Sequence, residues 1–439
     1  MRQIEDKTLV KSIFEDNKSD SLILSRSHRP DYQIVLFMGL LMLIGLVVIY
    51  AIGPQRANIL NNAYGSNYSQ SYFFIKQAVS LFVSLAAFAV MSVISLKFLT
   101  KNAAKLIIIA LILCSILAIA GFLNLDIAQK SLGATRWFDL GILGSFQPSE
   151  ALKFAVLIYI SMFLGNKLKQ GKLNNFRESL LPLSVIYLVS MLFVVVIQKD
   201  LGTGIALTSI VLCVLLVGKI NIKNSLIILG SLLIMGLAVV ATSPHRVERI
   251  LTYFKGDSSA SYIVDDNNYH VEHAKLAIGS GGLFGVGIGN SIQATGYLPE
   301  AINDSVFAII GETFGFIGLS VVLALFMVLL MRILKIMDCL EDMRLRLFAA
   351  GVFGWLGSHV MLNVASMIGL VPLTGITLPL LSLGGTSMLF ISSALGLVFQ
   401  LSRYTVHSSK IKEIHNEDLS SRRRIGGSRY SSRSRFGRN

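Results

Sequence analysis

The chain has 439 residues, of which 53% are hydrophobic and only 15% are charged. Soluble domains carry about 25% charged residues, so this composition excludes an ordinary soluble globular protein. The net charge of +14 would suit a nucleic-acid binder, but in so apolar a chain we interpret it as the positive charge that orients a membrane protein.

Apolar runs of 18 or more residues recur along most of the chain. About 20 helical residues cross a hydrocarbon core of about 30 Å, so these runs predict an all-α polytopic membrane protein with about ten transmembrane helices. The 32 mostly polar residues before the first run are too long for a signal-peptide n-region, so this run should stay as a span. The expected spans are 33–54, 74–96, 104–124, 147–166, 179–197, 202–218, 225–243, 305–333, 345–369 and 376–402.

The basic residues indicate the orientation of the chain. Most of the 39 Lys and Arg residues lie in the N-terminal segment 1–32, in alternate short loops and in the tail 404–439. Positive charge marks cytoplasmic segments, so both termini should be cytoplasmic, flanking a membrane domain at 33–403. The tail lacks the apolar content to fold and should be disordered. This topology leaves a large outer loop, 244–304, between helices 7 and 8, and loops of that length are usually functional.

The segment GATRWFDLGILGSFQPSEALKF precedes and opens the fourth span. Pro148 and Glu150 are typical of the first turn of a helix. Lys153 follows three residues after Glu150, on a neighbouring face of the same helix. Two interpretations stay open: Glu150 and Lys153 form a structural pair, or Lys153 and Arg136 offer cations to an anionic headgroup at the outer surface.

Two further segments contain polar residues between spans. In QKDLGTG, Asp200 suits the N-cap of the sixth helix. In the late outer loop, 271–278 (VEHAKLAI) predicts a short amphipathic helix at the membrane interface. The GxGxxG-like spacing within 279–289 has no βαβ unit around it, so a compact glycine-rich turn is expected rather than a dinucleotide site.

Acidic residues gather where the eighth span begins. Asp304 either caps this helix or presents a carboxylate at the mouth of a membrane cavity. Glu312 lies about 12 Å deeper along the helix, as a paired structural group or as part of a proton path. The residues alone do not choose among Glu300, Asp304 and Glu312 as the chemical group.

The run GLVPLTGITLPLLSLGGTSMLF places Pro, Gly and small polar residues inside the last apolar stretch. This pattern predicts a broken or closely packed helix, either as small-residue packing or as a groove wall that admits a lipid. Cys114, Cys213 and Cys339 match no metal-site spacing, so neither zinc nor a disulfide is expected.

Four segments together resemble the SEDS family, whose best-known members are FtsW and RodA. They are GATRW…QPSEALK, QKDLGTG, AIGSGGLFGVGIG…YLPEAINDSVFAIIGE and LVPLTGITLPLLSLGGTS, in the family's order, over about 33–403. The Gly311-Glu312 ending looks nearer to FtsW. The resemblance implies a ten-helix protein of the bacterial plasma membrane, at the division septum.

The resemblance also implies an enzyme, a peptidoglycan glycosyltransferase that polymerises lipid II into glycan strands. The family's essential carboxylate falls on Asp304, as general base for the acceptor sugar hydroxyl, with the lipid pyrophosphate as leaving group. A divalent cation, Mg²⁺ or Mn²⁺, or nearby cations would neutralise that group. The substrate-binding positions carried over from the motifs, with Lys199 added as a replacement cation where the family often has Pro, are Arg136, Glu150, Lys153, Lys199, Asp200, Glu300 and Glu312.

The implied partners are lipid II, undecaprenyl-pyrophosphate-linked glycan, a class B penicillin-binding protein transpeptidase and other division proteins, with no nucleic acid.

Some motif positions depart from the family: Ala294 stands where Lys is usual, and Ser305 and Thr313 change the flanks of Asp304 and Glu312. The alternatives are a lipid II flippase or transporter, an elongation-type RodA-like polymerase, and a scaffold that acts through the basic tail. The lack of a strong internal repeat weakens the transporter interpretation.

Overall fold

The computed structural model describes residues 28–131, 134–139, 144–218, 220–221, 230 and 266–405. Within these ranges, eight helices are long and apolar enough to cross a membrane, and one further apolar helix is shorter. The prediction of a helical polytopic membrane protein is therefore confirmed. The expected span 225–243 apart from residue 230, the first part of the outer loop, the N-terminal segment up to residue 27 and the tail from 406 lie outside the described residues.

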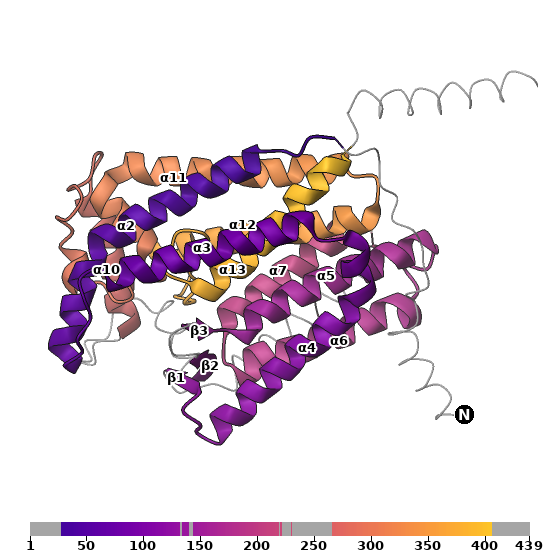
Figure 1. Cartoon of the computed structure of the whole chain (residues 1–439), viewed down its shortest axis with the longest axis horizontal. Helices are drawn as coiled ribbons and strands as arrows, with labels where there is room; N and C mark the ends of the chain where they lie inside the picture. Colours follow the sequence, from indigo (N-terminus) through magenta and orange to yellow (C-terminus); the bar gives the residue numbers. More distant parts are fainter. Residues whose placement is uncertain are drawn as a thin grey trace, which may run out of the picture.

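The helices are named in chain order (Figure 1). The long ones are α2 (Gln33–Tyr64), α3 (Tyr72–Val93), α4 (Leu96–Phe122), α5 (Pro148–Lys169), α11 (Val306–Cys339), α12 (Met343–Met367) and α13 (Gly385–Leu401). One span is a composite of the π-helical turns η2 (Phe176–Leu180) and η3 (Leu192–Ile197) around α6 (Leu181–Met191). The shorter elements are α7 (Leu201–Val217), α10 (Asp266–Ser280), η4 (Gln293–Thr295) and η5 (Ser402–Tyr404).

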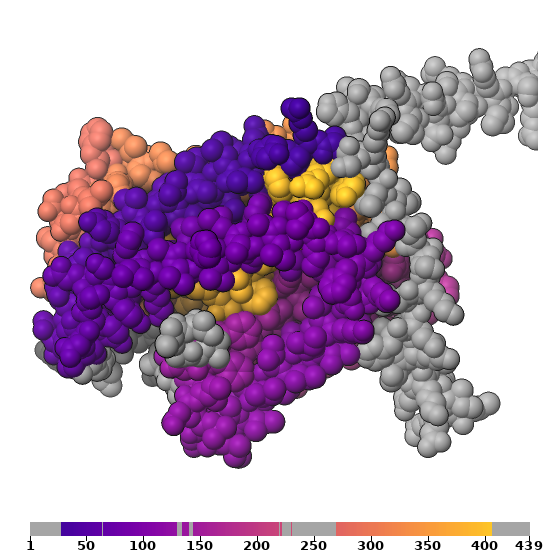
Figure 2. All heavy atoms as spheres, in the orientation of Figure 1, coloured from indigo at the N-terminus to yellow at the C-terminus, as the bar shows by residue number. Residues whose placement is uncertain are grey.

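Helix burial separates the centre of the bundle from its surface. The buried share of the most apolar 18-residue stretch is 83% in α5, 72% in α13 and 67% in α12. In α3 and α11 the buried share is only 22% and 28%. A helix that is apolar all round and buried lies in a core, and one with exposed apolar residues in a membrane protein faces lipid. The polar residues of α5 and α12 therefore lie in the protein interior, while α2 and α3 form the upper part of the face seen in Figure 2.

The two ends of the bundle differ. The helix α10 lies at the end where α2 finishes, and the described chain begins and ends at the opposite end (Figure 1). There the backbone N–H of His28 donates to the carbonyl of Arg403 at 2.9 Å. Both ends of the membrane domain thus share one side, as an even number of crossings requires. Assigning that side to the cytoplasm stays a prediction from the charge distribution.

A small antiparallel sheet follows α4, and the all-helical prediction missed it. Its strands β1 (Ala128–Ser131), β2 (Ala134–Asp139) and β3 (Ser145–Phe146) pair in the order β1-β2-β3. Phe138 of β2 packs with Leu117 and Ala120 of α4 in a hydrophobic cluster separate from the main core. The side chains of β2 alternate over only six residues, too few to stand out among apolar runs.

The last two motif segments are less regular than the expected spans. The final helix begins at Gly385 rather than near 376, because the preceding segment contains Pro372 and Pro379 and left-handed backbone at Gly375 and Leu380. This confirms the predicted break. We call residues 369–384 the broken segment.

The eighth span, expected as one helix, is interrupted at Gly315, where φ is +67° and ψ is −166°. The glycine-rich turn within 279–289 supplies the missing hydrogen bonds: Val286 N–H donates to the Glu312 carbonyl at 2.9 Å, and Phe316 N–H donates to the Gly282 carbonyl at 2.9 Å. Backbone groups freed inside a membrane must find such partners. The predicted compact turn is therefore confirmed, and it stabilises the break in α11.

Candidate active site

Asp304 lies in the turn that leads into α11. The turn is closed by the backbone N–H groups of Asn303 and Ser305, which both donate to the Glu300 carbonyl, at 2.9 and 3.2 Å. The helix itself starts at Val306, and its N-cap residue is Ser305. The N-cap interpretation of Asp304 was therefore wrong, and its carboxylate is left for another role.

The carboxylate of Asp304 is poorly solvated. Its Oδ1 atom is buried and has no hydrogen-bond partner among the described residues. Burial, and after it the negative charge of Glu300, raises the pKa of Asp304 to about 7, against the lowering effect of backbone N–H groups at Asp304 and Ser305. Desolvation thus outweighs the proximity of the helix start. A proton acceptor with a pKa near the working pH is suited to general base catalysis.

His270 of α10 supports the turn from the other side. Its Nε2 atom lies 2.6 Å from Ser305 Oγ, and Ser305 Oγ itself donates to the Pro299 carbonyl at 2.9 Å. Since that hydroxyl proton is committed to Pro299, Nε2 of His270 is the donor to Ser305. Burial lowers the pKa of His270, with Glu300 opposing it, so the imidazole is neutral at physiological pH. No motif in the sequence marked this residue.

The broken segment connects the site to α12. Asn363, fully buried in α12, donates through Nδ2 to the Asp304 carbonyl and to the Ile376 carbonyl, both at 2.7 Å. The backbone N–H of Leu383 donates to the Ile302 carbonyl at 2.9 Å. The third and fourth motif segments therefore share hydrogen bonds, and Asn363 orients the backbone beside the carboxylate.

Close glycine contacts fix the broken segment on two more helices. A Cβ atom at Gly202 of α7 would lie 2.5 Å from Ile376 Cγ1, and one at Gly45 of α2 would lie 2.6 Å from the Leu381 carbonyl oxygen. Buried Gln77 of α3 donates to the Leu381 carbonyl at 3.4 Å. Only glycine permits the helix backbones to approach the broken segment so closely. The broken segment is thus held from several sides.

Asp200 joins the first, second and fourth motif segments. Its Oδ1 atom accepts from the backbone N–H of Thr203 at 3.0 Å, which confirms the predicted N-cap of α7. Its Oδ2 atom accepts from Gln147 Nε2 at 3.1 Å, just before α5. Gln147 N–H in turn donates to Thr386 Oγ1 of α13 at 3.3 Å. All four segments quoted for the resemblance therefore meet at this end of the bundle.

Arg136, carried by β2, holds the turn before α7. Its Nη2 and Nε atoms donate to the carbonyls of Lys199 and Gln198 at 2.7 and 3.2 Å. Lys199 adopts left-handed backbone, with φ at +53°. The structure brings Arg136 and Lys199 together through the backbone, and their role toward a substrate stays a prediction.

We expect Lys199→Pro to destabilise the protein by more than about 1 kcal/mol, although Pro is common at this position in the family. The proline ring fixes φ near −65°, which is incompatible with the observed +53°. The matched Lys199→Gly variant should melt at the same or a higher temperature, because glycine adopts this conformation freely. Thermal unfolding of both variants in detergent is the measurement, and a Lys199→Pro variant with the wild-type melting temperature would contradict the prediction.

Lys153 and Glu150 form a buried ion pair within α5. Their Nζ and Oε1 atoms are 2.8 Å apart, and the Lys153 side chain is 0% exposed. Lys153 Nζ also lies 3.2 Å from His359 Nε2 and 5.0 Å from the centre of the Trp355 ring, both on α12. The structure thus contains the structural pair, while Arg136 binds carbonyl groups elsewhere. His359 was missed, although a histidine within an apolar span is itself a signal of a polar partner.

Glu312 holds the segment before η4. Its Oε1 atom accepts from the backbone N–H groups of Ile292 and Gln293 at 2.9 and 3.2 Å, and its Oε2 atom accepts from Ser291 Oγ. With a side chain buried in this way, Glu312 is the paired structural group of the two alternatives. Glu300, by contrast, is half-exposed and lies 3.7 Å from Arg56.

Neutralisation of a diphosphate by Mg²⁺ or Mn²⁺ stays a prediction. Across the described residues, no three His, Cys, Asp or Glu side chains gather into a metal site. A cation that arrives with a diphosphate needs only one or two carboxylates from the protein. The half-exposed carboxylate of Glu300 is a suitable ligand for such a cation, and its charge is close enough to raise the pKa of Asp304.

Comparison with known proteins gives a consistent result. Stage V sporulation protein E of Bacillus subtilis (strain 168) is 31% identical over 379 residues, which is 86% of this chain and 98% of that protein. The probable peptidoglycan glycosyltransferase FtsW of Nitrosomonas europaea is 31% identical over 379 residues, 85% of this chain and 93% of that protein. The corresponding FtsW of Buchnera aphidicola subsp. Schizaphis graminum is 32% identical over 328 residues, 73% of this chain and 88% of that protein.

Solved structures share the fold. A peptidoglycan synthase complex contains a chain that matches with a TM-score of 0.65 at 24% identity, covering 85% of this chain and 98% of that one. The rod shape determining protein RodA of Thermus thermophilus matches with a TM-score of 0.60 at 24% identity, covering 86% and 98%. The family model FtsW/RodA/SpoVE, described as "cell cycle protein", matches residues 32–407. This chain therefore belongs to the FtsW/RodA/SpoVE family of cell cycle proteins, as its four motif segments indicated.

Proposed function

We propose that this chain is a peptidoglycan glycosyltransferase that polymerises lipid II, with Asp304 as the general base. The observation that carries the proposal is the poorly solvated carboxylate of Asp304, with a pKa raised to about 7, in a turn that Asn363 of α12 holds in place. The relatives named peptidoglycan glycosyltransferase FtsW, which align over most of their length, support the same activity.

The reaction needs one proton acceptor and one stabilised leaving group. The acceptor sugar hydroxyl attacks the anomeric carbon of the donor while Asp304 takes the hydroxyl proton. The bond from the anomeric carbon to the lipid pyrophosphate breaks, and the pyrophosphate leaves with the electron pair. A positioned base accelerates such a step by about 10²–10⁴-fold. Asn363 fixes the backbone of Asp304, and Arg136 fixes the turn at Lys199, whose ammonium is the proposed cation for the pyrophosphate.

The proposed setting is the bacterial plasma membrane at the division septum. The undecaprenyl-pyrophosphate-linked glycan and lipid II would be the two substrates, and a class B penicillin-binding protein the transpeptidase partner. The multi-pass helical fold supports the membrane location. The similarity to a chain from a peptidoglycan synthase complex supports a partner enzyme.

The test is polymerisation of lipid II by the purified chain in detergent, with and without the transpeptidase. We expect glycan strands longer than a disaccharide unit. The rival flippase function needs two leaflets and makes no bond, so a flippase yields no strand in detergent. A protein that transports lipid II across vesicles but makes no strand under any partner condition would replace this proposal with the flippase.

We expect the polymerisation rate to rise with pH through about 7 as Asp304 ionises. The charge of Glu300 raises this pKa, so Glu300→Gln should lower it and move the rising limb of the pH–rate profile to lower pH. Glu178→Gln, at an exposed ion pair with Lys172, is the matched control and should leave the midpoint unchanged. An identical midpoint in wild type and Glu300→Gln would contradict the assignment of Asp304 as the titrating base.

A further inference from the structure

Three aromatic rings form a cluster between α10 and the turn that leads to Asp304. The Tyr269 and His273 rings of α10 have centroids 4.1 Å apart, and the His273 and Tyr297 rings are stacked, 6.1 Å apart with 10° between their planes. Hydrogen bonding of His273 Nδ1 to Gln293 Oε1 at 2.8 Å fixes the middle ring. Tyr297 is 53% exposed, so this cluster presents an aromatic face rather than a buried core.

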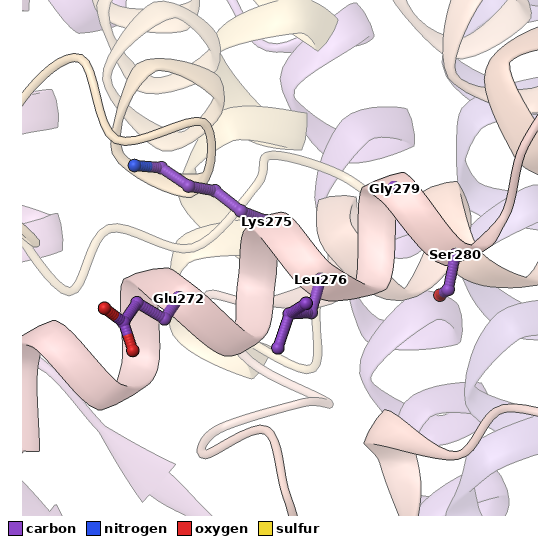
Figure 3. Close-up of a pocket in the computed structure, with 5 residues that line it drawn as sticks. All are labelled: Glu272, Lys275, Leu276, Gly279 and Ser280. Carbon is purple, nitrogen blue, oxygen red and sulfur yellow. The ribbon is translucent and has the colours of Figure 1, made fainter.

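The same helix also lines a shallow, open depression. Residues 269, 273, 276 and 280 are spaced by three or four, so they lie along one face of α10. Leu276 and Ser280 of this stripe line the depression together with Glu272, Lys275 and Gly279, as Figure 3 shows. The carboxylate of Glu272 and the hydroxyl of Ser280 therefore lie beside the apolar side chain of Leu276.

The elements that carry the three rings are connected to the turn of Asp304, the proposed base. The residue after Tyr269 is His270, whose Nε2 atom donates to Ser305, the neighbour of Asp304. Tyr297 precedes Glu300 in the turn that ends at Asp304. Lys275 extends from α10 toward the broken segment, against Gly369 (Figure 3). His270, the residue next to Tyr269, thus ties α10 to the turn that contains Asp304.

We propose that Tyr269, His273 and Tyr297, with the depression on α10, form a saccharide subsite that holds the glycan strand next to Asp304. The axial C–H bonds of a pyranose give it an apolar face that packs on the π face of an aromatic ring, while its hydroxyl and acetamido groups bond to polar side chains at the edge. A lipid tail would need no such polar rim. This inference rests on the proposed function and adds the location of the polymer.

The test uses the full chain in nanodiscs and a β-1,4-linked tetramer of N-acetylglucosamine as the probe. Tyr297→Ala and His273→Ala should weaken tetramer binding, measured by saturation-transfer NMR, by about three- to tenfold. Tyr297→Phe keeps the ring and should bind as wild type does. Tyr50→Ala, which removes a 63% exposed ring from α2, should also bind as wild type does. Both alanine variants should shorten the strands made from lipid II and raise KM more than they lower kcat.

Each result decides between the two proposals. Equal tetramer binding, KM and strand length in wild type and in folded alanine variants would exclude the saccharide subsite while leaving the polymerase intact. Tetramer binding that depends on Tyr297, in a protein that makes no strand, would remove the proposed function and keep the subsite. Displacement of the tetramer by farnesyl pyrophosphate, with no effect of excess tetramer on strand length, would show a lipid site and overturn the inference.

Discussion

Replacement of Asp304 by Asn or Ala should lower the rate of lipid II polymerisation by about 10²–10⁴-fold, because either change removes the proton acceptor. The thermal stability of the protein should not fall with the rate, and it should stay the same or rise at alkaline pH. The folded protein holds the proton of Asp304 more tightly than the unfolded chain does, so the stability due to this group is present at low pH and is lost as pH rises through about 7. At pH 8, Asp304→Asn should therefore melt at the same or a higher temperature than wild type.

This pairing of lost rate with retained stability separates a chemical role from a structural one. Asp338→Asn is a matched control, because that side chain is 64% exposed and lies at the cytoplasm-assigned end of α11. It should change neither the rate nor the melting temperature. Wild-type strand synthesis by a folded Asp304→Asn protein would remove Asp304 from the role of base.

Loss of the lysine from the buried ion pair should give the largest loss of stability. Lys153→Met leaves the Glu150 carboxylate buried without its cation, and breaking a buried pair in this way costs about 3–5 kcal/mol. The double variant Lys153→Met/Glu150→Gln removes both charges and should recover most of that loss. Unfolding of wild type, single variants and double variant in detergent completes a double-mutant cycle.

An exposed pair gives the control for this cycle. Lys172 and Glu178 are also 2.8 Å apart, but their side chains are 51% and 40% exposed, so Lys172→Met should cost no more than about 1 kcal/mol. A Lys153→Met protein that keeps wild-type stability and needs more lipid II for half-maximal rate would favour the other alternative, in which the ammonium binds pyrophosphate.

The spans were predictable because each depends on local composition. Twenty apolar residues must form a helix in lipid, wherever they later pack, and the expected 147–166 and 345–369 correspond closely to α5 and α12. The sheet and the break at Gly315 depend on contacts with distant residues. The break persists because the turn within 279–289 supplies its hydrogen bonds. No pattern within α11 predicts that this turn will pack against it.

The candidate site was predictable in part for the same reason. Asp200 was predicted as a cap because capping involves only the next three residues. A charged residue within a span, such as Lys153, predicts a polar partner in the protein interior, but the sequence does not identify that partner. The sequence placed Glu150 within reach, but His359 comes from a helix about two hundred positions later. Asn363, which orients the Asp304 backbone, resembles any other polar residue in an apolar run.

The close contacts of the broken segment limit how this protein can vary. Gly45 lies near the middle of α2, in a stretch whose neighbours Leu43 and Val47 are exposed on the lipid-facing side. A methyl group there would nevertheless collide with the backbone of Leu381, on the same segment whose Leu383 and Ile376 are bonded to the turn of Asp304 and to Asn363. Genetic screens for loss of wall synthesis should therefore recover substitutions at this membrane-embedded glycine, far in sequence from Asp304 and from the broken segment.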